Sequence, residues 1–374
     1  MTRNILIIAG ETSGDIHAAN LIRNLKAQKK DLRFFGIGGK KMEEEGVELL
    51  ARMEKLSIIG VSEIFAKLHD IRDAFKKISS AVKETPPDLA ILIDYPGFNL
   101  RLAKSLKKDN VKIVYYITPQ VWAWGKSRIN IIRKYVDKAL VIFKFEEELF
   151  KKHGIDATFV GHPLLDFYEN RSGLKRSDYG LKEDRTTIAL LPGSRESEVL
   201  RLLPTMLKTA DIIVEKADIQ FVLLKSSSVK KSTYEGFISL YSDRLALVED
   251  NTYGCLDMSD FVFTSSGTAT LECVIMEKPM LITYKTSLLT ALCFKVFART
   301  PFIGLANIIA GKEIAPEVLQ YDAKPRKMAE EILSIILSPE KMHEQRKALK
   351  EIKDKLGLPG ASMRASKEIA SLID

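Results

Sequence analysis

Short apolar runs alternate with amphipathic segments along most of the chain. The first run covers residues 5–9, and residues 17–27 after it repeat apolar positions at the spacing of a helix. Runs that are apolar throughout are typical of strands buried on both faces of a parallel sheet, with helices as the connections. The same pattern predicts further strands at residues 89–93, 112–117, 139–143 and 158–160.

The alternation lapses once, over the polar residues 168–185, which we interpret as a linker between two domains. It resumes with predicted strands at residues 187–191, 219–224, 245–248, 261–264 and 279–284. The predicted fold class is α/β, with two Rossmann-like doubly wound domains at residues 1–175 and 176–345 and a cleft between them. Such domains bind ligands at the carboxyl ends of their strands. We expect the Lys- and Glu-rich helices of residues 346–374 to pack back on the first domain.

The composition agrees with a folded protein and argues against several classes. A chain of 374 residues with 46% hydrophobic and 28% charged residues suits two α/β domains. Its three cysteines form no CxxC pair, which argues against a disulfide framework or a structural zinc site and favours buried thiols in a reducing cytosol. The net charge of +8 favours phosphorylated substrates, anionic lipid or nucleic acid, or else reflects solvated lysines on helix faces.

Two apolar stretches bear on membrane contact. Neither reaches the roughly 20 apolar residues that a membrane-spanning helix needs, and the N-terminus lacks the pattern of a signal peptide. Residues 285–311 combine an apolar helix face with Lys295 and Arg299, four residues apart, before Pro301 ends the helix. This pattern fits either a helix lying on anionic lipid or a buried interdomain helix. Residues 56–65 are expected to form a core helix, with contact to an acyl chain as the alternative.

Polar side chains follow two predicted strands of the first domain. Gly10 and Gly14 allow a tight turn after the first strand, where a helix start offers free N–H groups. Glu11 and Ser13 lie on this turn. Asp94 follows a later strand, where a carboxylate could accept a proton from a substrate hydroxyl. The plain alternatives are a capped helix start at the first loop and an Asx-turn at Asp94.

Two loops of the second domain favour anion binding. Gly193 and Ser194 follow its first predicted strand, and Arg195 beside them can bind phosphate oxygens with two parallel hydrogen bonds. The alternative is a surface arginine beside an ordinary turn. Residues 264–272 combine hydroxyls and a glycine with the start of a helix, which also suits an anion. Glu272 in that helix could reach a ribose or could serve as a capping residue.

Metal-binding signals are lacking in the sequence. No Asp-x-Asp motif is present, and the five histidines show no ligand spacing. We therefore expect no metal and no cofactor. His162, between Gly161 and Pro163, is interpreted as a hydrogen-bonding group that lines the ligand cleft, or alternatively as a plain turn residue.

Seven motifs in order give the chain a resemblance that no single loop provides. Together they resemble the lipid-A-disaccharide synthase family of Gram-negative bacteria, over essentially the whole chain. The motifs are AGETSGD at 9–15, IDYPGFN at 93–99, TPQVWAWGKSR at 118–128, FVGHPLLD at 159–166, LPGSRESEV at 191–199, SSGTATLE at 265–272 and LANIIAG at 305–311.

The resemblance implies a GT-B glycosyltransferase fold and an inverting reaction. UDP-2,3-diacylglucosamine and 2,3-diacylglucosamine 1-phosphate would give the β-1,6-linked lipid A disaccharide 1-phosphate and UDP. It also implies a cytoplasmic enzyme on the anionic surface of the inner membrane, acting as a monomer or homodimer, with no nucleic-acid partner. One departure is Gly97, where an acidic residue is more usual in such a segment.

The resemblance also implies roles for individual residues. Asp94 would be the general base, and Glu11 would either assist it or bind the sugar. Ser13, Gly14 and His162 would lie on the acceptor side. The residues implied for the UDP-sugar are Ser194, Arg195, Ser266, Gly267, Thr268, Glu272, Asn307 and Gln320.

Two other functions fit parts of the pattern. A UDP-N-acetylglucosamine 2-epimerase, or the transferase that builds the peptidoglycan precursor, would share the fold and the phosphate loops. A non-catalytic lipid- or nucleotide-binding module would lack a reason for the two carboxylates, Glu11 and Asp94.

Overall fold

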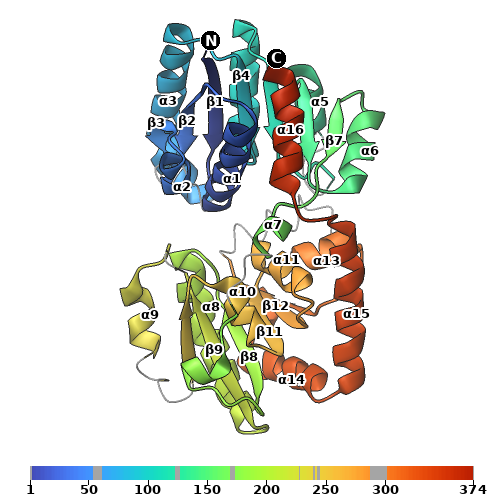
Figure 1. The fold of residues 1–374 in the computed structure, drawn as a ribbon. Helices are drawn as coiled ribbons and strands as arrows, with labels where there is room; N and C mark the ends of the chain where they lie inside the picture. The colour runs from blue at the N-terminus through green and yellow to red at the C-terminus, as the bar shows by residue number, and fades with distance from the viewer. Residues whose placement is uncertain are drawn as a thin grey trace. The chain divides into compact units, whose positions relative to one another are not determined.

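The computed structural model describes residues 2–53, 61–122, 127–168, 173–226, 228–238, 241, 245–286 and 301–373. They divide into two compact units (Figure 1). The first combines residues 1–166 with residues 356–374, and the second covers residues 167–355. The divisions lie at other residues than the 175 and 345 of the sequence analysis, because the helix before residue 356 belongs to the second unit.

The first unit is built on a parallel sheet with the strand order β3-β2-β1-β4-β5-β6-β7. Its strands are short and, from β4 to β6, almost fully buried, as the continuous apolar runs predict. They are β1 (Arg3–Ala9), β2 (Leu32–Gly38), β3 (Glu48–Arg52), β4 (Leu89–Ile93), β5 (Ile113–Tyr116), β6 (Lys138–Val141) and β7 (Ala157–Phe159).

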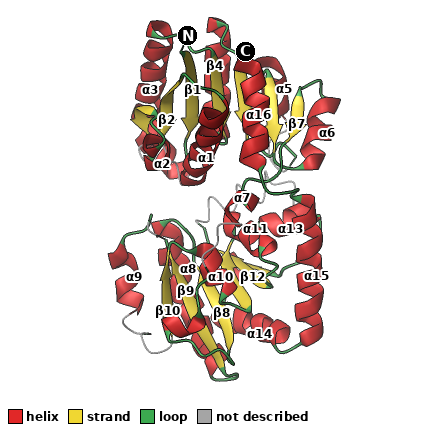
Figure 2. Ribbon diagram, in the orientation of Figure 1, coloured by secondary structure: helices red, strands yellow, loops and turns green. Residues whose placement is uncertain are grey.

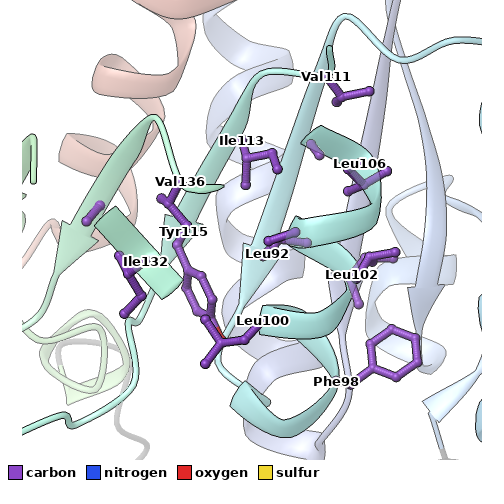
Figure 3. Close-up of a cluster of buried hydrophobic side chains, with 14 of the residues drawn as sticks. Leu92, Phe98, Leu100, Leu102, Leu106, Val111, Ile113, Tyr115, Ile132 and Val136 are labelled. Carbon is purple, nitrogen blue, oxygen red and sulfur yellow. The ribbon is translucent and has the colours of Figure 1, made fainter. Parts of the chain in front are cut away.

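Helices connect these strands and cover the sheet. On one face, α3, α4 and α5 pack against apolar side chains of the central strands, and Figure 3 shows Tyr115 of β5 among them beside Leu100. The C-terminal helix α16 packs against α1. The helices are α1 (Thr12–Gln28), α2 (Lys40–Glu44), α3 (Val61–Glu84), α4 (Pro96–Leu106), α5 (Ser127–Tyr135), α6 (Lys144–Lys152), α7 (Leu165–Tyr168) and α16 (Ala361–Ile373).

The second unit repeats the design with the strand order β10-β9-β8-β11-β12-β13, again all parallel (Figure 2). Helices α8 and α14 pack on one face of its sheet. The strands are β8 (Thr186–Leu191), β9 (Ile219–Lys225), β10 (Leu245–Glu249), β11 (Phe261–Ser265), β12 (Met280–Tyr284) and β13 (Glu317–Leu319). The helices are α8 (Glu196–Val214), α9 (Lys231–Ile238), α10 (Thr252–Asp257), α11 (Thr268–Ile275), α13 (Leu305–Ala310), α14 (Pro325–Ile336) and α15 (Pro339–Lys355).

Two residues fix the return of the chain to the first unit. The Asp166 carboxylate accepts from the backbone N–H groups of Gly360, Ala361 and Ser362, at 2.7–2.9 Å, and so caps α16. The Arg364 guanidinium donates to the carbonyl of Val160 at 2.7 Å and to two carbonyls just before α16. The first unit therefore includes a helix that the order of the sequence places more than 190 residues away.

All ten predicted strands are present, and their ends lie within two residues of the predicted ends. Strands β2, β3 and β13 were missed, because β2 contains glycines and β3 and β13 carry charged residues at their ends. Cys255 and Cys273 are buried, as expected. Most of the apolar stretch that carries Lys295 and Arg299, and the first part of residues 56–65, lie outside the described residues.

Candidate functional site

The strand order of the first sheet creates a crevice between β1 and β4. The chain runs outward from β1 to β3 and then crosses to β4 on the other side of β1, which makes this the topological switch point. Ala9 pairs with Ile93 in the last register of the two strands. Gly10 and Asp94 therefore leave the sheet side by side at its carboxyl edge.

The turn after β4 has a strained backbone that its neighbours hold in place. Asp94 and Tyr95 both have positive φ, 45° and 47°, a conformation that residues other than glycine seldom adopt. The Asp94 carbonyl accepts from the Tyr115 hydroxyl at 2.6 Å and from the Asn99 amide at 2.8 Å. The Tyr95 ring then lies against Gly10, where an added Cβ would come within 2.2 Å of the ring.

The carboxyl group of Asp94 is tuned by this arrangement. Burial, and after it the negative charge of Glu11, raises the pKa of Asp94 to about 6. The same two causes raise the pKa of the Tyr95 hydroxyl to about 12. Asp94, Tyr95 and Glu11 thus share one electrostatic site. A carboxylate with a pKa slightly below neutrality is ionised at pH 7 yet basic enough to take a proton.

Other residues predicted on the acceptor side lie near this edge, in different surroundings. Ser13 is half-buried in the first turn of α1, and Gly14 is buried against Ala9. His162 is buried, and its Nδ1 accepts from the Leu164 N–H at 3.3 Å. Burial, followed by the neighbouring His17, lowers the pKa of His162 to about 3, so its ring is neutral inside the unit.

The second sheet has its own switch point, between β8 and β11. Both candidate anion loops leave the sheet there, since Leu191 of β8 pairs with Thr264 of β11. Gly193 has a φ of 121°, and an added Cβ would come within 2.4 Å of the Glu198 carboxylate. Arg195 precedes α8, with its Nη1 3.3 Å from Glu198 Oε1, and its side chain is 41% exposed.

The loop after β11 is open at its centre. Gly267 has a φ of 131°, and an added Cβ would meet no atom within 4 Å. The Thr270 hydroxyl donates to the Gly267 carbonyl at 2.7 Å and so fixes the start of α11, while Ser266 is half-buried and Thr268 is exposed. Burial raises the pKa of Glu272, one turn into α11, to about 7.

Asn307 and Gln320 lie in the second unit, in α13 and at the end of β13. The Asn307 side chain is fully buried, and its amide makes four hydrogen bonds, to Ala315, Glu317 and Ile314. This uses every donor and acceptor of the amide, so in this structure Asn307 orders its loop. Gln320 has a φ of 50°, and its side-chain oxygen accepts from the Thr286 N–H at 3.3 Å.

The structure thus brings the loops of Glu11 and Asp94 together at the first switch point and the two candidate anion loops together at the second, while Asn307 and Gln320 belong to other loops of the second unit. Sequence reasoning missed Asn99 and Tyr115, which donate to the Asp94 carbonyl, and Tyr95, whose ring lies against Gly10. It also missed Glu317, which accepts from the Asn307 amide. Tyr95 and Asn99 belong to the motif around Asp94, but Tyr115 carried no signal, since it reads as one more apolar position of a strand.

The described residues were also compared with the requirements of a metal site and of a membrane-spanning helix. They contain no group of three or more His, Cys, Asp or Glu side chains that could hold a metal ion. Among the helices that the structure describes, none is long and apolar enough to cross a membrane.

Comparison with known proteins adds a family to this geometry. The family model described as "Lipid-A-disaccharide synthetase" matches residues 5–372. A lipid-A-disaccharide synthase of Syntrophus aciditrophicus is 41% identical over 373 residues, which cover 99% of this chain and 97% of that protein. The synthase of Geobacter sulfurreducens is 38% identical over 373 residues, with 98% and 97% covered.

Solved structures of low sequence identity share the fold. A UDP-GlcNAc 2-epimerase from Neisseria meningitidis, bound to UDP-GlcNAc, has a TM-score of 0.65 at 11% identity and covers 98% of this chain and 100% of its own. The glycosyltransferase of kitacinnamycin has a TM-score of 0.63 at 14% identity, with both chains fully covered. The predicted GT-B architecture is therefore confirmed.

Proposed function

Because the chain belongs to the lipid-A-disaccharide synthetase family, we propose that its first unit activates the acceptor hydroxyl and its second unit holds the diphosphate of the donor. The chain is a glycosyltransferase of lipid A biosynthesis, which takes a UDP-sugar and a lipid acceptor. The proposed reaction joins UDP-2,3-diacylglucosamine to 2,3-diacylglucosamine 1-phosphate through a β-1,6 linkage and releases UDP. The observation that carries the division of roles is the contrast between carboxylates at one switch point and anion-binding groups at the other.

Asp94 is the general base of the proposed mechanism. Its carboxylate accepts the proton of the acceptor 6-hydroxyl as that oxygen attacks C1 of the donor sugar. The bond between C1 and the diphosphate oxygen breaks, the configuration at C1 inverts, and UDP leaves with the bonding electron pair. The pKa of about 6 supports this role, since burial and Glu11 make Asp94 a stronger base than an exposed aspartate.

The leaving diphosphate gains negative charge as the bond breaks. Arg195, the Ser194 loop and the turn at Ser266, Gly267 and Thr268 are proposed to stabilise that charge with a cation, hydroxyls and backbone N–H groups. The open space before Gly267 supports close approach of a phosphate. These groups require no metal in the proposed mechanism, so activity should survive EDTA. Glu272 is proposed to bind the ribose hydroxyls, with Asn307 and Gln320 ordering loops of the same unit.

Release of UDP on mixing the two diacyl sugars tests the proposed function. A coupled assay should show one UDP for each disaccharide formed, and none when the acceptor is omitted. Conversion of UDP-N-acetylglucosamine alone to its 2-epimer would instead support the epimerase. Binding of both substrates without any UDP release would leave a non-catalytic module.

We further propose that the protein acts at an anionic membrane surface, as a monomer or homodimer. The lipid acceptor of the family and the net charge of +8 support this proposal. Co-sedimentation with vesicles that contain anionic lipid should weaken as salt rises, because salt screens the attraction. Absent or salt-insensitive binding would contradict an electrostatic association.

A further inference from the structure

One sequence motif has no role in the proposed mechanism, the segment TPQVWAWGKSR at 118–128. Its described part begins directly after β5, the strand next to β4 in the sheet. The carboxyl ends of parallel strands meet at one edge. Residues 118–122 therefore begin at the same edge of the first unit as Asp94, one strand further along.

The chain enters this segment through a strained position. Ile117 has a φ of 58°, a genuine outlier for a β-branched residue, and its N–H donates to the Leu140 carbonyl at 3.1 Å. Thr118, next to it, is only 2% exposed, and its hydroxyl has no hydrogen-bond partner among the described residues. Strain and unpaired buried polar groups persist where function requires the conformation.

The indole ring of Trp122 is held from one side by a buried carboxyl group. Its Nε1 donates to Glu146 Oε1 at 2.8 Å, and Glu146 Oε2 accepts from the Phe143 N–H at 3.2 Å. Glu146 is 0% exposed and lies in the first turn of α6, where its side chain accepts from the backbone N–H of the N-cap residue Phe143. Both carboxyl oxygens are occupied, so the position of Glu146 fixes the orientation of the Trp122 ring.

Aromatic rings surround Trp122 on the side of α6. The Phe145 ring meets it edge to face at 5.1 Å, and Phe143 stacks on Phe145 at 5.6 Å. Phe145 is 41% exposed, and Trp122 is half-buried, so part of this aromatic cluster remains open at the edge. A flat apolar surface framed by polar groups matches a pyranose ring, which has one face of C–H groups and a rim of hydroxyls.

We propose that Trp122 is the platform on which the glucosamine ring of the acceptor stacks, and that Glu146 is the positioning residue that holds it. This inference rests on the proposed function, because Asp94 on the neighbouring strand is the base for the same sugar. The acceptor ring is favoured over an acyl chain, because the half-buried indole follows β5 at the sheet edge that carries Asp94, the base proposed for a hydroxyl of that ring.

Fluorescence provides a direct test, since the chain has two tryptophans. In a Trp124→Phe variant, Trp122 is the sole tryptophan. Titration with detergent-dispersed 2,3-diacylglucosamine 1-phosphate should shift its emission saturably, and UDP should not. An emission that is unchanged at acceptor concentrations well above KM would overturn the inference.

Kinetics of two substitutions separate binding from folding. Trp122→Leu should raise KM for the acceptor by about tenfold through the lost stacking, with KM for the donor unchanged. Trp122→Phe, which keeps a ring, should lie between this variant and the unsubstituted protein. An unchanged acceptor KM in Trp122→Leu, or an equal rise in both KM values, would contradict the platform.

Glu146 requires a graded test, because its removal could unfold α6. Glu146→Gln retains an oxygen that can accept from the indole N–H, so it should rescue acceptor KM relative to Glu146→Ala. The control is Glu147→Gln on the same helix, which should leave both KM values unchanged. Equal acceptor KM in the Gln and Ala variants would overturn the positioning role.

The outcomes distinguish this inference from the function on which it rests. No UDP release from the two diacyl sugars by the unsubstituted protein overturns the proposed function itself. Normal UDP release together with an unchanged acceptor KM in Trp122→Leu overturns only the platform.

Discussion

The two units share one strand topology, but the side chains at their switch points carry opposite charges. Each presents two loops at the switch point of a parallel sheet, between β1 and β4 in the first unit and between β8 and β11 in the second. The first pair of loops carries the carboxylates Glu11 and Asp94, while the second carries Arg195, hydroxyls and glycines. The difference shows that strand order fixes where a ligand can bind, and that the side chains after each strand decide which ligand it is.

The backbone at the two switch points differs in the same way. In the second unit the positive φ angles fall on Gly193 and Gly267, which adopt them at little cost. In the first unit they fall on Asp94 and Tyr95, and hydrogen bonds to the Asp94 carbonyl hold the turn. A cradle for an anion needs bare backbone, whereas a base needs a side chain at a fixed position.

Loss of the base should have the largest effect. Asp94→Asn should lower kcat by about 10²–10⁴ with little change in donor binding, because it removes proton transfer in the transition state. Steady-state kinetics and UDP binding measure the two quantities. Asp88→Asn is the matched control, since Asp88 precedes the same strand at its other end and forms a surface ion pair with Arg3. An unaltered kcat in Asp94→Asn would remove Asp94 as the base.

Removal of the Arg195 side chain in the second unit should have the second-largest effect on activity. Arg195→Gln should lower turnover by about 10²–10³, the usual cost of one group that stabilises developing charge, while the protein stays folded. Arg185→Gln is the control, because Arg185 lies at the opposite, amino end of β8 and forms an ion pair with the exposed Asp218. Full activity of the Arg195 variant would break the assignment of the diphosphate to this unit.

Loss of the cap on α16 should affect stability rather than chemistry. Asp166→Asn leaves a weaker acceptor for three backbone N–H groups, which should lower the free energy of unfolding by about 1 kcal/mol. Hydrogen exchange should rise in α16 and stay unchanged in the second unit, which contains no part of this contact. Equal changes in the two units would contradict the division of the chain at residues 166 and 355.

The smallest expected effect concerns pH. The acid limb of kcat/KM should follow an apparent pKa near 6, because Asp94 must lose its proton to act as base. Glu11→Gln removes a negative charge that raises this pKa, so the limb should move to lower pH by less than about one unit. A limb that stays in place would show that Glu11 does not act on Asp94.

The raised pKa of Asp94 also has a consequence for the stability of the fold. The folded protein binds the Asp94 proton more tightly than the unfolded chain does, so the contribution of Asp94 to stability is present at low pH. It declines as pH rises through the window that ends near 6. Asp94→Asn should therefore flatten the pH dependence of unfolding in that window, as urea titrations at pH 4 and pH 7 can measure.

The sequence predicted most of the fold but fewer of the supporting contacts. Continuous apolar runs located strands such as β4 and β8, because burial on both faces leaves no polar position in them. It could not locate β3 or β13, because both strands are short and include charged residues rather than a continuous apolar run. It also could not predict the four hydrogen bonds by which the buried Asn307 amide holds its own loop, because only folding creates those contacts.

By itself, the sequence determined the alternation of strands and helices, the ordered motifs and the carboxylates and anion loops, because these depend on residue type and local spacing. Only the tertiary structure decided that Gly10 lies against Tyr95, that Tyr115 fixes the Asp94 turn and that Glu146 orients Trp122. Each of these contacts joins residues that lie in, or follow, different strands of the sheet. It therefore depends on the order and register of the strands, which no local pattern encodes.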